Sequence, residues 1–420
     1  MAITDIKEFS HLTAADVEAL GRELDQIRLD VEDSRGIRDA RYIRRVIRVQ
    51  RALELGGRIA LFGSKYRPAW LAGTALLSIS KIIENMELGH NVMHGQWDWM
   101  NDPEIHSCSW EWDQTGPSEH WKRAHNYQHH TYTNVVGMDE DLGFGILRMT
   151  RDEAWKPINL LQPIANVILA ATFEWGIALH DLTAAAKLEG AVKGQLNSQA
   201  NKDFARKIVR QVGKDFVVFP LLTGPAWKST LTANATANLV RNLWAYVVIF
   251  CGHFPDGAEK FTVAEFEQET RHEWYLRQML GSANFNSGKL MGFMSGNLSY
   301  QIEHHVFPDL PSNRYPEIAV KMRALCEKFD LPYTTGSLFK QYVLALRTIH
   351  KLALPDKWLI ATSDNAPETS SELRFREPGI KGAALAMVDD LRTDPVTGKR
   401  MGLLTALKSQ ARSRLPKRKK

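Results

Sequence analysis

The sequence predicts an all-α integral membrane protein, with about four transmembrane helices in two hairpins beneath a cytoplasmic helical domain that holds a metal site. Three observations predict this fold. Apolar residues are concentrated in a few segments, although the mean hydropathy of the 420-residue chain is −0.29. Basic residues cluster beside these segments, and eight of the 14 histidines fall in four short motifs. This pattern is typical of a membrane anchor under a polar cap and excludes a many-span transporter.

The first region, 1–52, predicts amphipathic helices. Apolar residues recur at helical spacing from about Ala14 to Arg51, and the second half of this stretch is strongly basic. The acidic start of the chain contains no apolar core of the signal-peptide kind, so we expect no cleaved signal.

The second region, 53–350, begins with an apolar pair of segments at 53–63 and 68–80, separated by a turn-like stretch at 64–66. This spacing predicts a tight hairpin whose second helix continues to His90 and His94. Charged residues at 81–87 are too costly for the centre of a bilayer, so this end of the helix should emerge from it.

Three further apolar segments follow. Residues 157–179 predict a single span interrupted only by Glu174, and 231–251 predict another that ends just before His253. Residues 216–222 are apolar but too short to cross alone. The last region, 351–420, is basic and rich in Pro, Ser, Glu and Lys, which predicts a partly disordered tail.

The distribution of basic residues predicts the orientation. Clusters at 35–58 and 399–420 favour the cytoplasmic side of the inner membrane for both termini, and an even number of spans agrees with this. The same topology places all four histidine motifs on the cytoplasmic side. Three cysteines without a CxxC pair indicate a reduced, intracellular setting.

The histidine motifs have the spacing of metal ligands. In HNVMH at 90–94 the i, i+4 spacing puts both imidazoles on one helix face, where they can bind one metal. HNYQHH at 125–130 repeats this spacing, with His130 about 100° further round the helix and able to reach a second metal. Two more histidines lie in QIEHH at 301–305, and one follows the apolar segment that ends at 251. The eight candidate ligands are therefore His90, His94, His125, His129, His130, His253, His304 and His305.

Residue type alone does not choose the metal, because imidazole binds iron, copper, zinc and nickel. The number of histidines is more informative. A structural or hydrolytic zinc needs about three or four ligands, whereas eight imidazoles suit two metals. Two redox metals can collect electrons one at a time and present two of them to O₂.

These residues resemble the membrane fatty-acid desaturase family, with its HxxxH, HxxHH and [HQ]xxHH boxes. The similarity extends from about 53 to 331. Gln301 replaces the first histidine of the third box, as in the front-end branch of that family. The stretches 84–112 and 251–260 are similar to actinobacterial, mycobacterial-type acyl-CoA desaturases.

The resemblance implies a di-iron site in which the eight histidines are the ligands and no other residue acts as catalytic acid or base. Gln301 would be a possible ninth ligand or bind an iron-bound water. The implied reaction uses O₂ to place a cis double bond in a long acyl chain, with conversion of stearoyl-CoA to oleoyl-CoA as the leading expectation. Neither an HPGG haem motif nor a GxGxxG motif occurs, so we expect no bound haem or flavin. Electrons would come from a separate NAD(P)H-dependent reductase or ferredoxin-type donor.

Other residues have candidate roles. Trp97, Trp112 and Trp121 could line an acyl tunnel, or belong to an aromatic belt or the core. Asp139 and Asp141 could orient ligand histidines, as could His120, whereas we expect Glu140 in solvent. The remaining candidates, for the phosphates of coenzyme A, are Lys122, Arg123 and Arg314.

Three other functions are compatible with parts of this pattern. A hydroxylase could use the same di-iron scaffold, and a zinc-dependent membrane hydrolase could use some of the histidines. A non-catalytic lipid-sensing protein could have kept the fold. No nucleic-acid partner is expected, because the basic tail has no interleaved aromatic residues.

Overall fold

The computed structural model describes residues 9–188, 198–255, 257–356 and 407, and it is mainly helical, which confirms the all-α prediction. The predicted disordered tail lies almost wholly outside the described residues. The longer helices are α1 (Ala14–Ser34), α2 (Ile37–Ala60), α3 (Arg67–Ile83), α7 (Gln162–Ala171), α8 (Phe173–Leu188), α9 (Ser198–Val212), α11 (Trp227–His253), α13 (Arg271–Leu280), α16 (Tyr315–Lys328) and α17 (Leu338–Leu352). The shorter ones are α4 (Asn91–Met93), α5 (Ser118–Trp121), α6 (His130–Tyr132), α10 (Phe219–Leu222), α12 (Val263–Phe266), α14 (Lys289–Met294) and α15 (Gln301–Val306).

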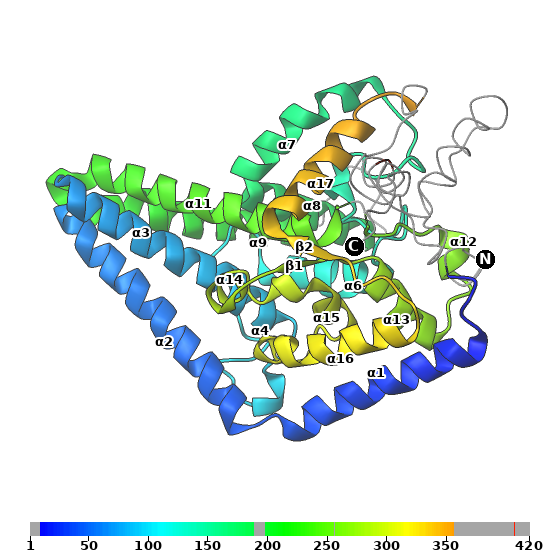
Figure 1. Cartoon of the computed structure of the whole chain (residues 1–420). Coiled ribbons are helices and arrows are strands. Elements are labelled where there is room, and N and C mark those ends of the chain that lie inside the picture. Colours follow the sequence, from blue (N-terminus) through cyan, green and yellow to red (C-terminus); the bar gives the residue numbers. More distant parts are fainter. Residues whose placement is uncertain (1–8, 189–197, 256, 357–406, 408–420) are drawn as a thin grey trace, which may run out of the picture.

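Helices α2, α3 and α11 lie side by side and form an arm that projects from the rest of the molecule (Figure 1). The predicted hairpin is confirmed: α2 ends just before the 64–66 turn, and α3 starts with Pro68 in its first turn, where a missing N–H is tolerated. Gly57 and Gly73 let the two helices approach, because a Cβ on Gly57 would lie 3.2 Å from the Gly73 carbonyl oxygen. The basic cluster at 35–58 and the apolar segment at 53–63 were predicted as separate segments, but both belong largely to one helix, α2.

The partner of α11 at the arm's tip differs from the prediction. Helix α9 runs into the π-helical segment η8 (Gly213–Val218) and then α10, and the tight turn at 223–226 leads into α11. The apolar 216–222 segment is therefore the end of a longer helical stretch whose earlier part is amphipathic. The predicted span 157–179 packs beside the second half of α11, where Tyr246 donates a hydrogen bond to Asn166 over 2.8 Å.

The prediction of one continuous helix over 157–179 is wrong, because this segment bends by 102° between α7 and α8. Thr172 ends α7: its hydroxyl donates back to the Ile168 carbonyl, and its own carbonyl accepts the first N–H groups of α8. Gly176 permits the fold-back, because a Cβ there would lie only 2.5 Å from Cδ1 of Leu169.

Buried ion pairs join the helices of the arm. Asp215 of η8, 1% exposed, accepts from Arg58 over 2.9 Å and from Lys81 over 2.6 Å. Lys81 also pairs with Asp113, which pairs with Lys214. These charges neutralise one another inside the bundle, so segments that are too polar by hydropathy can still pack there.

None of the described helices is both long and apolar enough to cross a membrane on its own. The bent pair 157–171 and 173–183 meets the length and composition only when its two halves are taken together. The four predicted spans therefore remain a prediction.

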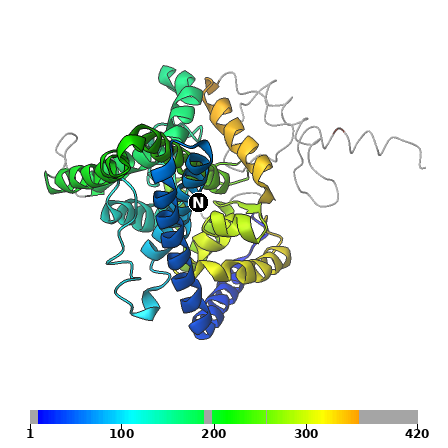
Figure 2. The same ribbon diagram turned by 90° about the vertical axis from the view of Figure 1, so that its left-hand side faces the viewer.

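The cap that surrounds the histidines is built from the N-terminal and C-terminal parts of the chain. Helix α1 lies beside α16 in both views (Figures 1 and 2), joined by ion pairs such as Lys321–Asp30 at 2.6 Å. Strands β1 (Asn284–Asn286) and β2 (Thr335–Ser337) form a parallel pair with Asn284 opposite Thr335. Together they enclose α15, whose residues are all buried.

Candidate metal centre

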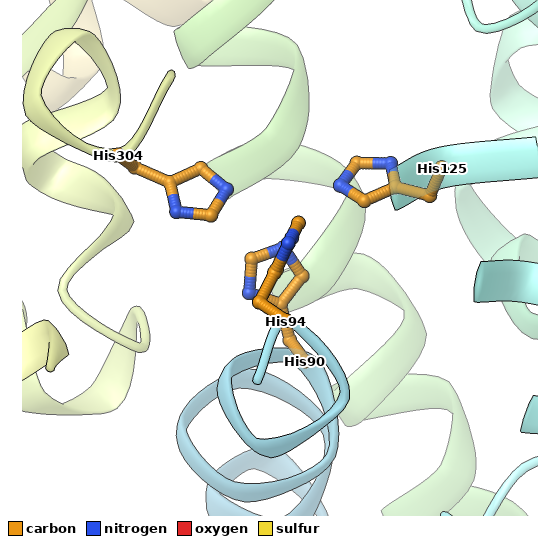
Figure 3. Close-up of side chains that lie close together, drawn as sticks. All are labelled: His90, His94, His125 and His304. Carbon is orange, nitrogen blue, oxygen red and sulfur yellow. The ribbon is translucent and has the colours of Figure 1, made fainter. Parts of the chain in front are cut away.

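Four chain segments bring seven of the eight predicted histidines into two clusters. In each cluster the ring nitrogens that could bind a metal lie within 4.8 Å of one another. The first cluster is His90, His94, His125 and His304, whose rings face a common space (Figure 3). The second cluster is His129, His253 and His305. The structure thus brings all four motifs to one place.

The clusters divide the motifs in a way that the sequence spacing did not predict. His90 and His94 share a cluster as expected, and the adjacent His304 and His305 are divided between the two clusters. His125 and His129 are also divided, although both lie with Asp141 in a third group of potential ligands. The reason is local: the second motif lies in the π-helical segment η5 (Lys122–His129), not in an α-helix. The wider i→i+5 turn displaces residues four apart relative to their places in an α-helix, and π-turns of this kind are frequent at functional sites. The His125 and His129 rings still stack, with centroids 5.0 Å apart.

His130 lies between the clusters. Its ring centroid is 4.7 Å from that of His94 and 4.5 Å from that of His305, one histidine of each cluster. Both of its ring nitrogens are buried and have no hydrogen-bond partner among the described residues. A buried polar atom without a partner is costly, so this side chain fits a ligand role toward a bound metal.

The outer faces of the rings are held by hydrogen bonds. Nδ1 of His125 lies 3.0 Å from Asp141, and Nδ1 of His129 lies 3.0 Å from Asp139. Nδ1 of His304 lies 3.2 Å from Tyr315, and Nδ1 of His305 lies 3.0 Å from Gln278. On the same four rings Nε2 is buried and has no partner in the described part of the chain. A ligand histidine typically hydrogen-bonds through one nitrogen and presents the other to the metal, so the donor set fits metal ions.

Electrostatics favour neutral imidazoles, the form that binds metals. Burial, together with repulsion between neighbouring rings, holds the pKa of six of these histidines well below the ordinary value. These six are His94, His125, His130, His253, His304 and His305. Burial lowers the pKa of His90 to about 4. Burial also opposes the charge on His129, but the carboxylates of Asp139 and Asp141 outweigh it and raise its pKa.

Gln301 lies beside the second cluster. Its Nε2 is 2.9 Å from Nε2 of His253, and its buried Oε1 has no partner among the described residues. Gly252 makes room for it, because a Cβ there would lie 2.8 Å from Cγ of Gln301. An amide oxygen at this position can bind a metal or a metal-bound water, so its role as a ninth ligand stays a prediction.

A largely apolar cavity opens next to the histidines. His90, His125, His129 and His253 line one part of it. Its apolar wall is formed by Met86, Phe144, Phe173, Ile177, Ile249, Phe254 and Leu298. A cavity of this composition suits a hydrocarbon chain with one stretch held against the ligand side chains.

Two of the three predicted tryptophans belong to this cavity. Trp112 and Trp121 line it, and Trp121 stacks on His125 with ring centroids 4.5 Å apart. Trp97 does not line it; this fully buried ring packs in a separate core cluster with residues such as Ile43 and Val92. Its surroundings indicate a packing role.

The residues around the ligands were partly predictable. Asp139 and Asp141 contact ligand histidines as expected. Tyr315 and Gln278 do so from α16 and α13, and sequence reasoning missed them, because no spacing rule links them to the motifs. His180, which has no motif around it, has its Nδ1 3.8 Å from Asp141 and its Nε2 2.9 Å from the Glu140 carbonyl oxygen.

Comparison with known proteins agrees with this site. The family described as fatty acid desaturase matches residues 68–337. The NADPH-dependent stearoyl-CoA 9-desaturase of Mycobacterium tuberculosis is 56% identical over 424 residues, which cover 100% of this chain and 97% of the relative. The sn-1 linoleoyl-lipid 6-desaturase of Synechocystis is 25% identical over 67% of this chain and 79% of its own. The chain belongs to the fatty acid desaturase family.

Proposed function

We propose that this protein is an O₂-dependent stearoyl-CoA 9-desaturase that receives electrons from NADPH through a separate reductase. The observation that carries the proposal is the 56% identity over the whole chain to a relative of that name. The convergence of all four histidine motifs beside an apolar cavity supports it. The balanced reaction joins stearoyl-CoA, O₂, NADPH and H⁺ to give oleoyl-CoA, two waters and NADP⁺.

Two iron ions are the proposed cofactors. His90, His94, His125 and His304 would hold one iron, while His129, His253 and His305 would hold the other. His130 and Gln301 are available to either coordination shell. Iron bound there would supply the O₂ activation that cleavage of an unactivated C–H bond requires.

The protein's own contribution is to position the acyl chain. The cavity wall holds a methylene pair against the histidines, and its aromatic residues Phe144, Phe173 and Phe254 exclude water from the reacting carbons. Trp112 is fixed in this wall by a 2.7 Å hydrogen bond from its indole N–H to the Gly116 carbonyl. The depth of the cavity then decides which carbons lie next to the metal ligands.

A basic hollow nearby suits the phosphates of coenzyme A. Arg123, Arg206, Lys207 and Arg210 line it, together with Glu119, Asp203 and Glu111, which pair with the first three of these cations. Of the other two cations predicted for this role, Lys122 pairs with Glu119 over 3.0 Å. Arg314 is buried in ion pairs with Asp39 and Glu317, which favours a structural role for it.

We also propose that the arm is embedded in the inner membrane, with both termini and the histidines on the cytoplasmic side. Exposed apolar residues near the tip support this placement; they include Leu55, Ile59, Phe62, Leu221, Leu222 and Trp227. Helix α11 has 27 residues, which at 1.5 Å per residue corresponds to about 40 Å, enough to reach across a bilayer core. Helix α7 presents a second exposed apolar face, with Ile164, Val167 and Ile168.

Gas chromatography of fatty acids from cells that express the chain with a reductase tests the proposal. We expect oleate to accumulate with the wild type and not with His304→Ala, provided that both proteins are present at equal levels. A hydroxy acid would move the assignment to a hydroxylase. Absence of any product with iron and reductase supplied, together with bound zinc, would favour the hydrolase instead.

A further inference from the structure

A second opening reaches the histidines from outside. We name it the His94 hollow; its residues include His94, Cys108, Lys122, Arg123, Asn126 and Tyr127. The acyl cavity is lined by His90, His125, His129 and His253 but not by His94. The first cluster is therefore approached from two sides, by an apolar cavity and by a separate, polar hollow.

The His94 hollow lies at the end of the molecule away from the arm's tip. The segment that carries Cys108 is tied to the first part of α2 by an ion pair of 3.0 Å between Arg44 and Asp102. The tip lies at the other end of α2, near Leu61 (Figure 1). A soluble protein could reach the hollow while the arm is in a membrane.

The surface of the hollow has the character of a weak protein interface. Tyr127 is 57% exposed although it is aromatic, and aromatic residues are enriched where proteins bind one another. The charges nearby are mixed: Lys122 and Arg123 both pair with Glu119, at 3.0 and 3.7 Å, and Asp98 and Asp309 also line the hollow. Small interfaces are typical of transient electron-transfer partners.

We propose that the His94 hollow is the docking site of the electron-donating redox domain; this inference rests on the proposed function. Electron transfer slows steeply with distance, so a donor must approach where a ligand histidine lines a hollow that is open to the donor. At the hollow, His94 itself is part of the floor. NADPH supplies two electrons to the donor and becomes NADP⁺, and the donor passes them singly across this face. The acyl cavity and the His94 hollow share no lining residue, so the acyl chain and the donor can be bound together. The hollow proposed for coenzyme A shares Glu119 and Arg123 with the His94 hollow, so the donor would dock next to the coenzyme A phosphates.

Cys108 provides a direct test. It is exposed in the hollow, whereas Cys251 and Cys326 are buried, so a maleimide reagent should modify Cys108 selectively. The control is Cys108→Ser combined with Val320→Cys, which moves the same label to a 70%-exposed position on α16 outside the hollow. Two quantities are measured on each labelled protein: the affinity for the reductase, from the fluorescence of the label, and the KM for the reductase in desaturation.

We expect the label at Cys108 to respond to the reductase and to raise the KM for it at least tenfold, while the control label does neither. A single turnover driven by dithionite should proceed equally in both, because it bypasses docking. A wild-type KM with a silent label at Cys108 would overturn the proposal. Failure of the dithionite turnover in unlabelled protein would count against the proposed desaturase function, and the fluorescence readout would still decide whether the reductase docks here.

Discussion

The two metal positions should respond separately to substitution of their outer hydrogen-bond partners, and Asp139→Asn is the sharpest such change. The Asp139 carboxylate lies 3.0 Å from Nδ1 of His129 through both oxygens. It also accepts the backbone N–H groups of Asn134 over 2.7 Å and Asp141 over 3.0 Å, one at each oxygen. Of the two all-histidine clusters, His129 belongs to the second, and it also lies with His125 and Asp141 in a third group of potential ligands.

The size of the effect follows from this geometry. An asparagine has an NH₂ group in place of one oxygen, so in either orientation it faces a backbone donor and loses a hydrogen bond. A buried donor left unpaired costs about 1–3 kcal/mol. Loss of an outer partner of a ligand histidine typically lowers metal affinity about 10–100-fold, which agrees with that range.

Anaerobic equilibrium dialysis against Fe²⁺ measures the result. We expect one of two irons to bind about 10–100-fold more weakly in Asp139→Asn and the other to keep its affinity. Tyr315→Phe is the matched variant, because Tyr315 contacts His304 of the first cluster. Equal weakening of both irons by Asp139→Asn, in protein with an unchanged circular dichroism spectrum, would refute the assignment of separate clusters.

Three further variants test the fold and the cavity. Asp215→Ala removes the shared partner of Arg58 and Lys81, and breaking a buried pair should lower the free energy of unfolding by about 3 kcal/mol. Denaturant titration should show this loss. As a control, Glu18→Ala at an exposed ion pair should change the free energy of unfolding little. Gly296→Ala places a Cβ 2.2 Å from the Met86 carbonyl oxygen at φ +67°, so it should lower the unfolding temperature and the iron content together, and wild-type values would contradict the packing described. Ile249→Trp fills part of the acyl cavity and should shift the products toward chains shorter than 18 carbons, as seen by gas chromatography, with iron content unchanged; an unaltered chain-length profile would remove Ile249 from the substrate path.

The meeting of the histidine motifs could be predicted from the sequence, because motifs with i, i+4 spacing and adjacent histidines rarely occur together in one chain outside a metal site. The first hairpin was predictable from an equally local pattern: its turn at 64–66 separates two apolar runs. The division of His125 and His129 between clusters was not predictable, since it depends on a π-helical turn that no residue signals.

The helical stretch that precedes α11 at the tip was not predicted, for an energetic reason. Hydropathy counts each charge as a cost, and it therefore favoured 157–179 over the stretch that contains Lys207, Lys214 and Asp215. In the folded chain these charges are paired, for example Lys207 with Glu111 over 2.6 Å. Such pairing depends on residues about 100 positions apart, and a window of local sequence does not contain it. The bend at Thr172 combines local hydrogen bonds with a distant residue, since Asn242 donates to the Ala171 carbonyl and accepts the Glu174 N–H.

The π-helical segments η3 (Glu84–His90) and η5 also determine which genetic changes this chain can tolerate. Each contains a turn that is wider than an α-helical turn by one residue. A deletion of one codon within 84–89 would let the backbone of this stretch return to regular i→i+4 α-helical hydrogen bonding. It would also rotate everything that follows by about 100°, so that His90 and His94 would no longer face the other rings. Insertions and deletions should therefore be eliminated across related genes even at positions where a residue that is not a ligand varies, and gap-free stretches in an alignment would reveal the two segments without any structure.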